Sequence, residues 1–153
     1  MPKIEKITKQ TENPYVNLYL VEGKNKVDHP FRYYVASRAK TMEALKIKTK
    51  KNTPDGVLMY SLYGEKRDKI VLVRQYRVSI DDYIYEFPAG LVESGEEFHE
   101  AAVREMHEET GLTFHPLKVD PCYEKPFFTT IGMTDEACSA VYGWCEGEIS
   151  RKY

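Results

Sequence analysis

The most constraining feature of this chain is a glutamate-rich stretch at residues 90–112, GLVESGEEFHEAAVREMHEETGL. Seven of its 23 residues are glutamates, although the whole chain is nearly neutral, with 22 basic and 24 acidic residues. Ser94 followed by Glu97 has the spacing of a capping box, and Gly111 stands where a left-handed residue commonly ends a helix. The sequence therefore predicts a helix over about 95–110.

Three of these glutamates share one face of the predicted helix. At about 100° per residue, Glu105, Glu108 and Glu109 point to the same side. Like charges at this spacing oppose helix formation, and carboxylates near a helix C-terminus also oppose the helix dipole. A positive group should therefore lie close to them. Arg104 could supply surface ion pairs, and a divalent cation is the alternative, because Mg²⁺ and Mn²⁺ prefer hard carboxylate oxygens.

The spacing of the whole stretch resembles the signature of the Nudix hydrolases. Gly90, Glu96 and the run REMHEETGL at 104–112 occupy its positions. In that family the segment forms a loop, a helix and a loop whose carboxylates hold divalent ions against a diphosphate. The resemblance implies Mg²⁺ or Mn²⁺ as the cofactor and a nucleoside diphosphate linked to another moiety as the substrate.

Site residues follow from the same resemblance, position by position. The implied metal ligands are Glu105, Glu108, Glu109 and the backbone carbonyl of Ala89. Arg104 and Glu96 are implied to orient these ligands and to complete the catalytic set.

Three segments outside this stretch resemble the ADP-ribose pyrophosphatases. They are VRQYR at 73–77, YEFPAGLVESGE at 85–96 and GMTDEA at 132–137. The roughly 80 residues before the glutamate-rich stretch also resemble the N-terminal β extension of those enzymes. The resemblance also implies substrate-binding residues. Arg77 would contact the diphosphate, and Glu86 would line the site. Glu136 would face the terminal ribose or the attacking water, and Arg38 would contribute from the extension.

Two departures from the pyrophosphatase pattern bear on function. Thr130, Ile131 and Gly132 stand where those enzymes commonly carry Ser-Pro-Gly, which leaves the preference for ADP-ribose open. The chain also ends 41 residues after Leu112, before the family's last strand, base-bearing loop and covering helix. We therefore expect the final helix of the fold to be missing.

Alternating apolar and polar residues predict several strands around the helix. They are expected at 15–22, 31–37, 56–64, 69–77, 82–90, 116–124 and 136–148, with a loop at 46–52. Aromatic residues such as Tyr83 and Tyr85 are expected in the core rather than on a ligand. The expected fold is α/β (α+β): a Nudix mixed sheet with its loop-helix-loop at 56–153, incomplete at the C-terminus. An antiparallel β extension at 1–55 precedes it and is expected to mediate dimerisation.

Composition limits the partners and the compartment. A net charge of −2 without a basic field argues against nucleic acid. No apolar run reaches the length of a membrane span or of a signal-peptide core, which predicts no membrane partner. Three cysteines without CxxC spacing suit a reducing compartment, so a cytoplasmic protein is expected. By resemblance to the pyrophosphatases, the expected assembly is a homodimer.

Two classes of function stay open at this point. The first is a metal-dependent pyrophosphohydrolase that cleaves ADP-ribose, or a related nucleoside diphosphate derivative, to AMP and a sugar phosphate. NADH or an oxidised nucleoside triphosphate would be other substrates within this class. The second is a catalytically impaired Nudix module that binds a ligand without turnover, which the short C-terminal part favours.

Overall fold

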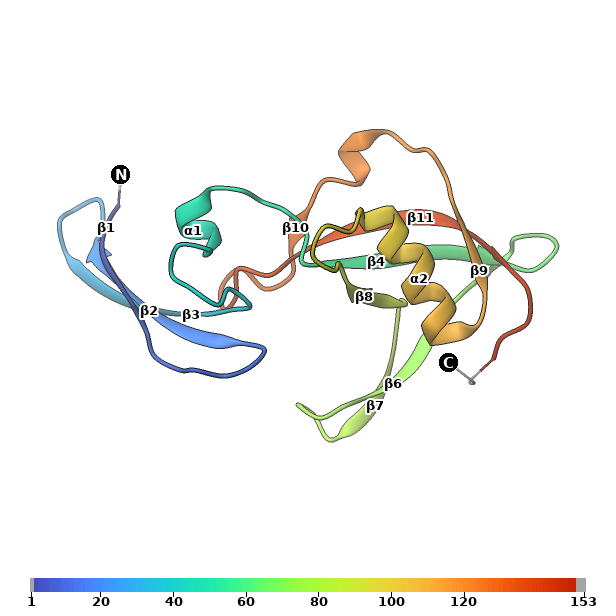
Figure 1. The fold of residues 1–153 in the computed structure, drawn as a ribbon, viewed down its shortest axis with the longest axis horizontal. Helices are drawn as coiled ribbons and strands as arrows, with labels where there is room; N and C mark the ends of the chain where they lie inside the picture. Colours follow the sequence, from blue (N-terminus) through green and yellow to red (C-terminus); the bar gives the residue numbers. More distant parts are fainter. Residues whose placement is uncertain (1, 151–153) are drawn as a thin grey trace. The chain divides into compact units, whose positions relative to one another are not determined.

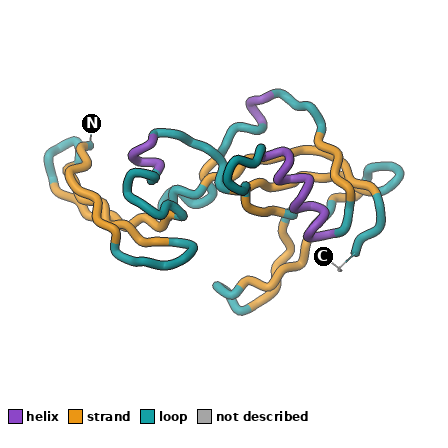
Figure 2. The backbone as a smooth tube through the Cα atoms, in the orientation of Figure 1, coloured by secondary structure: helices purple, strands orange, loops and turns teal. Residues whose placement is uncertain are grey.

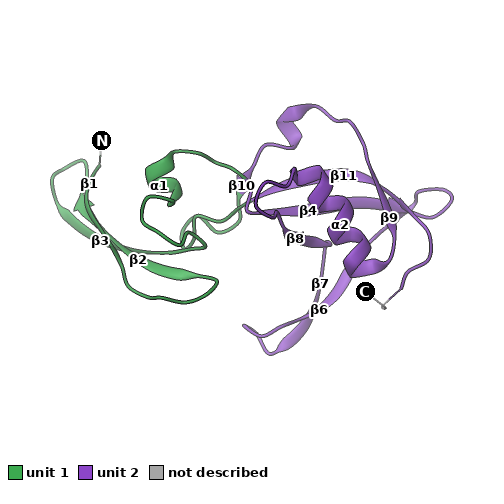
Figure 3. Cartoon of the chain, viewed as in Figure 1, with its two compact units in different colours: residues 1–53, 128–137 green, residues 54–127, 138–153 purple. Residues whose placement is uncertain are grey.

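The computed structural model describes residues 2–150 and divides into two compact units. Among the described residues, the first comprises 2–53 and 128–137, and the second comprises 54–127 and 138–150 (Figure 3). Sequence reasoning placed the boundary at 55 and assigned 128–137 to the Nudix part, whereas here this segment joins the first unit. No helix within residues 2–150 is long and apolar enough to cross a membrane.

The first unit is built on a three-stranded antiparallel sheet in the order β1-β2-β3. Its strands are β1 (Lys3–Lys9), β2 (Asn17–Lys24) and β3 (Pro30–Ser37), which confirms the antiparallel N-terminal extension. β1 escaped prediction because its sequence, KIEKITK, is mostly charged and its strand is held by backbone pairing with β2. The expected loop at 46–52 contains a one-turn helix, α1 (Lys46–Thr49).

A mixed sheet, as predicted, forms most of the second unit. Its order is β10-β11-β4-β5, and β8 pairs with β4 while β9 pairs with β11. β11 runs parallel to β4, whereas β5, β8 and β9 pair antiparallel with their neighbours. The strands are β4 (Gly56–Tyr63), β5 (Lys69–Ile70), β8 (Ala89–Leu91), β9 (Thr113–Pro116), β10 (Phe127–Phe128) and β11 (Ala137–Glu146).

Two predicted strands are interrupted, and one is wrong. The expected strand at 69–77 divides into β5 and β6 (Val73–Arg77), and the one at 82–90 divides into β7 (Asp82–Glu86) and β8. Pro88 lies at the second break, where a residue without an N–H cannot donate to a sheet. The strand expected at 116–124 is a loop with a 3₁₀ turn, η1 (Pro121–Tyr123), whose N-cap side chain precedes the proline.

β6 and β7 form a separate two-stranded hairpin. Most of its side chains are exposed, and Tyr83 and Tyr85 have 50% and 71% of their surface accessible. These two tyrosines are therefore exposed, and the expectation that they belong to the core is wrong. Tyr83 instead packs edge-on against Tyr76 across the hairpin.

Helix α2 (Phe98–Thr110) lies across the mixed sheet (Figure 1), and it is the longer of the purple α-helical segments in Figure 2. It contacts β4, β8 and β9. Ala101, Ala102 and Met106 are fully buried in the core under this helix. The two alanines allow the helix backbone to approach the sheet closely, because they fill little volume.

The predicted end of α2 is confirmed, whereas its predicted start is wrong. Gly111 caps the helix with φ 75° and donates its N–H to His107. The N-cap is Glu97 rather than Ser94, because residues 93–96 form a turn and the Glu97 carboxylate accepts the N–H of His99. The helix therefore begins about three residues later than the capping-box spacing indicated.

Candidate active site

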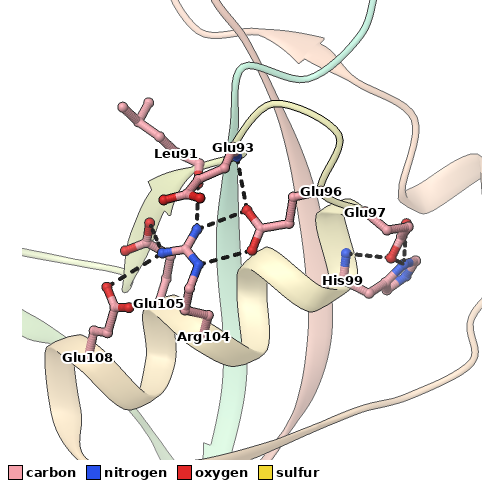
Figure 4. Close-up of polar contacts among 8 residues, drawn as sticks. All are labelled: Leu91, Glu93, Glu96, Glu97, His99, Arg104, Glu105 and Glu108. Atoms are coloured by element: carbon pink, nitrogen blue, oxygen red, sulfur yellow. Dashed lines mark hydrogen bonds and ion pairs between the residues drawn. The ribbon is translucent and has the colours of Figure 1, made fainter.

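Arg104 organises the carboxylates on the exposed side of α2 (Figure 4). Its Nε and one terminal nitrogen donate to the two carboxylate oxygens of Glu96 at 2.9 and 3.0 Å. The other terminal nitrogen donates to Glu105 at 2.9 Å and to Glu108 at 3.4 Å. A further bond of 3.0 Å reaches the Leu91 carbonyl on β8. The planar guanidinium thus ties the helix to the loop that precedes it.

This network changes the ionisation of its members. The hydrogen bond to Arg104 is the main cause that holds the pKa of Glu96 below its ordinary value. The hydrogen bond to Glu96, with the hydrogen bond and charge of Glu105, raises the pKa of Arg104 although burial opposes the rise. Glu96 and Arg104 are therefore both charged near neutral pH. Of the two positive groups that the sequence left open, Arg104 contacts the glutamate face through an ion-pair network rather than through isolated pairs.

The backbone at residues 89–90 comes very close to the helix. A Cβ atom at Gly90 would lie under 3.0 Å from the carboxyl group of Glu105, so this position accepts only glycine without a rearrangement. The Ala89 N–H donates to Glu109 Oε2 at 3.2 Å. Pairing of β8 with β4, with Ala89 opposite Leu58, holds this backbone in place. Glu105 and Glu109 therefore face the backbone of β8 directly.

Glu109 is the most electrostatically perturbed carboxylate of the site. Burial raises its pKa to about 7, and the charges of Glu105 and Glu86 act in the same direction. The Ala89 N–H and the charge of Arg77 oppose the rise without cancelling it. Negative charge is thus in excess around Glu109, which is the condition under which an added cation binds well.

The carboxylate oxygens of Glu105, Glu108 and Glu109 are suitable ligands for a divalent ion, although each carboxylate already accepts a hydrogen bond. Within residues 2–150, no three His, Cys, Asp or Glu side chains are grouped closely enough to hold a metal ion as they stand. The reason is visible in the hydrogen bonds: Glu105 and Glu108 are bonded to Arg104, and Glu109 accepts from Ala89. A cation would have to compete with Arg104 for two carboxylates.

The four residues expected to bind substrate form two ion pairs, one in each unit. In the second unit, Arg77 Nε on β6 lies 2.7 Å from Glu86 Oε1 on β7, and this hydrogen bond is the main cause of the raised pKa of Arg77. In the first unit, Arg38 Nε lies 2.8 Å from Glu136 Oε1. Sequence reasoning named all four residues but did not predict either pairing.

Sequence reasoning also missed a contact at the start of α2. His99 lies between two carboxylates, with Nδ1 3.0 Å from Glu97 and Nε2 2.8 Å from Glu124. The first carboxylate is two residues away and could have been suspected from the local spacing. Glu124 is 25 residues further along, and nothing in the sequence around it indicates the contact.

The fold of this chain resembles that of a solved structure. A crystal structure described as that of an ADP compounds hydrolase superposes with a TM-score of 0.70, covering 96% of this chain and 69% of that one. At 19% identity this likeness establishes a shared fold. Residues 52–148 match the family model of the NUDIX domain, and the chain therefore belongs to the NUDIX domain family. The family resemblance inferred from the sequence is confirmed.

Curated relatives point to one branch of that family. An ADP-ribose pyrophosphatase of Saccharomyces cerevisiae is 35% identical over 80 residues, which is 51% of this chain and 35% of the yeast protein. An ADP-sugar pyrophosphatase of Mus musculus is 36% identical over 87 residues, covering 55% of this chain and 40% of the mouse protein. An ADP-ribose pyrophosphatase of Bacillus subtilis is 44% identical over 61 residues, covering 39% and 33%. The chain thus spans about a third of the length of the curated relatives it matches.

Proposed function

We propose that this chain hydrolyses the diphosphate of ADP-ribose, or of a related nucleoside diphosphate derivative, to AMP and a sugar phosphate. The observation that carries the proposal is the carboxylate face of α2, set against strand β8, where Gly90 leaves no space for a side chain beside Glu105 as that carboxylate now lies. The names of the yeast, mouse and Bacillus subtilis relatives support an ADP-linked substrate.

A divalent ion, Mg²⁺ or Mn²⁺, is part of this proposal. Glu105, Glu108, Glu109 and the carbonyl of Ala89 would hold it. When bound, such an ion neutralises charge on a diphosphate and lowers the pKa of a coordinated water. Arg104 keeps two of these carboxylates on the side of the helix that faces the loop, and Glu96 fixes the plane of its guanidinium.

The ion pairs supply groups for the rest of the substrate. Arg77 carries a planar cation suited to two phosphate oxygens, and Glu86 holds that cation in one orientation. Arg38 and Glu136 form the equivalent pair in the first unit, and we assign Glu136 to the terminal ribose or the attacking water. A homodimer formed through the β1-β2-β3 sheet, acting in the cytoplasm, completes the proposal.

Release of AMP from ADP-ribose by the purified chain tests it. Reactions contain Mg²⁺, Mn²⁺ or chelator, and a panel adds NADH, nucleotide sugars and oxidised nucleoside triphosphates. We expect metal-dependent cleavage that Glu108→Gln reduces by about two orders of magnitude or more, because a ligand to the ion is lost. Glu65→Gln, at an exposed turn residue of the same unit, should retain the parent rate.

The outcomes separate the candidate functions. Cleavage of another panel member in place of ADP-ribose would keep the hydrolase and change its substrate. Absence of turnover with Mn²⁺ bound, as measured by calorimetry, would overturn the hydrolase and leave a ligand-binding module. Equal rates in the parent and Glu108→Gln would overturn the assignment of this carboxylate to the metal.

A further inference from the structure

His99 occupies a position between two acceptors from different parts of the second unit. It lies in the first turn of α2, where its own N–H and its Nδ1 both meet the carboxylate of Glu97, at 2.8 and 3.0 Å (Figure 4). Its Nε2 lies 2.8 Å from Glu124 Oε1. The His99 side chain is 34% exposed and that of Glu124 only 15%, so water competes weakly for the second contact.

Only the charged form of this histidine can satisfy both contacts. A neutral imidazole has one N–H and one lone pair, whereas an ionised carboxylate only accepts hydrogen bonds. With a carboxylate at each nitrogen, a neutral ring would leave a lone pair facing an oxygen. The imidazolium instead donates to both Glu97 and Glu124, and each bond is charge-assisted.

The charges around His99 agree with this assignment. Burial acts to lower the pKa of His99, but the hydrogen bonds and charges of Glu124 and Glu97 outweigh it and raise the pKa. His99 also lines a surface pocket together with Glu100 and Arg104 of α2 and with Pro116 of β9, which carries no charge. Arg104 is already engaged by Glu96, and Glu100 adds a further negative charge.

His99 links the start of α2 to a segment that lies far from it in the sequence. Glu124 ends the η1 turn, and its backbone carbonyl accepts a 2.9 Å hydrogen bond from Ser139 Oγ on β11. The segment 117–126 is thereby fixed to the sheet on one side and to α2 on the other. On the helix side, Glu97 directly follows Glu96, which holds the guanidinium of Arg104.

We propose that His99 is a positioning residue that acts as an imidazolium clamp, tying the segment 117–126 to the start of α2 and fixing the turn that carries Glu96. Its effect on catalysis rests on the function proposed above, whereas the clamp itself does not. Because the pKa of His99 is raised in the folded protein, the clamp is complete at low pH. It is lost as pH rises through that pKa.

The clamp is tested without any activity by NMR titration of the His99 ring and by native-state amide exchange, corrected for its intrinsic pH dependence. We expect His99 to titrate above 6.5, the ordinary value for histidine. Exchange in 117–126 should become about tenfold faster above that pH, the effect of losing one charge-assisted hydrogen bond. His99→Gln should show the fast exchange at every pH, and His99→Lys should restore slow exchange up to higher pH.

A matched control is available in the same unit. His115 pairs with a single carboxylate, Glu146 at 2.9 Å, and stacks on Trp144, so His115→Gln should leave exchange in 117–126 unchanged. Glu124→Gln removes one charge and supplies an amide that can donate to a neutral ring, which should bring the titration of His99 down. The clamp would be overturned if His99 of the parent titrates at or below 6.5. It would also be overturned if neither His99→Gln nor Glu124→Gln changes the rate of amide exchange in 117–126.

The positioning role is tested by turnover of ADP-ribose. His99→Gln should lower kcat about three- to tenfold with little change in KM, because a small displacement of a catalytic group costs rate rather than binding. His99→Lys should recover most of it. If His99→Gln speeds amide exchange in 117–126 but leaves kcat unchanged, the positioning role is rejected. If the parent cleaves nothing on the panel, the proposed function fails, while titration and exchange still decide the clamp.

Discussion

Replacement of Glu109 by glutamine should stabilise the metal-free protein above neutral pH. A rise in pKa from 4.5 to about 7 on folding corresponds to about 3.4 kcal/mol against the ionised form. Glu109 keeps partial access to solvent, which screens the effect, so we expect about 1–2 kcal/mol in the measured free energy of unfolding. Glutamine retains an oxygen that can accept the Ala89 N–H and carries no charge.

The direction with pH follows from the raised pKa. The contribution of Glu109 to stability is fully present below pH 4.5 and is lost as pH rises through about 7. The parent and Glu109→Gln should therefore have similar stability near pH 4.5. At pH 8 in chelator, the variant should unfold about 3–6 °C higher or at a correspondingly higher urea concentration.

Metal should reverse this order if Glu109 is a ligand. An ion that binds only the folded parent, at a concentration one hundred times its Kd, adds about 2.7 kcal/mol to the free energy of unfolding. With Mn²⁺ in excess at pH 8, the parent should therefore overtake Glu109→Gln. Glu65→Gln serves as the charge-matched control and should follow the parent in both conditions. Equal or lower stability of Glu109→Gln at pH 8 in chelator would refute the electrostatic reasoning, and equal stabilisation of both proteins by Mn²⁺ would refute the ligand assignment.

Three further substitutions test the packing and geometry of the site. Gly90→Ala should weaken Mn²⁺ binding in calorimetry with little loss of stability, because the new methyl group meets only the distal part of the flexible Glu105 side chain and displaces its carboxylate. Arg104→Lys should reduce turnover at least tenfold with a smaller loss of stability, since an ammonium cannot make the two-pronged contact with Glu96. Met106→Ala should lower the free energy of unfolding by about 2–5 kcal/mol in urea titrations, because Met106 is fully buried under α2.

Two of these substitutions, Gly90→Ala and Met106→Ala, have a matched control. Gly132→Ala adds a methyl group where no atom lies within 4 Å, and it should be nearly neutral. Val103→Ala, on the same helix with 38% exposure, should cost much less than Met106→Ala. A Gly90→Ala protein with parental Mn²⁺ affinity would show that the position of the Glu105 carboxylate is not needed for metal binding. An Arg104→Lys enzyme with parental kcat would show that charge alone is sufficient at this position.

The sequence by itself determined the family, the mixed-sheet class and the end of α2. These features depend on local patterns: the spacing of glycine, arginine and glutamates in 90–112, and the backbone freedom of Gly111 at φ 75°. The core face of α2, on which Ala101 and Ala102 are fully buried, was not predicted from the sequence. The start of the helix was not predicted either, because Ser94 has the capping-box spacing and only the turn at 93–96 leaves the N-cap to Glu97.

Tertiary structure alone decided how these residues are connected. Arg38 and Glu136 are 98 residues apart and His99 and Glu124 are 25 apart, yet each pair is joined by a hydrogen bond of 2.8 Å. Their contacts depend on where the backbone places them rather than on local sequence. The raised pKa of Glu109 has the same origin, because burial and the charges of neighbouring carboxylates exist only once the chain has folded. Local patterns specify which groups are present, and packing specifies which of them share one environment.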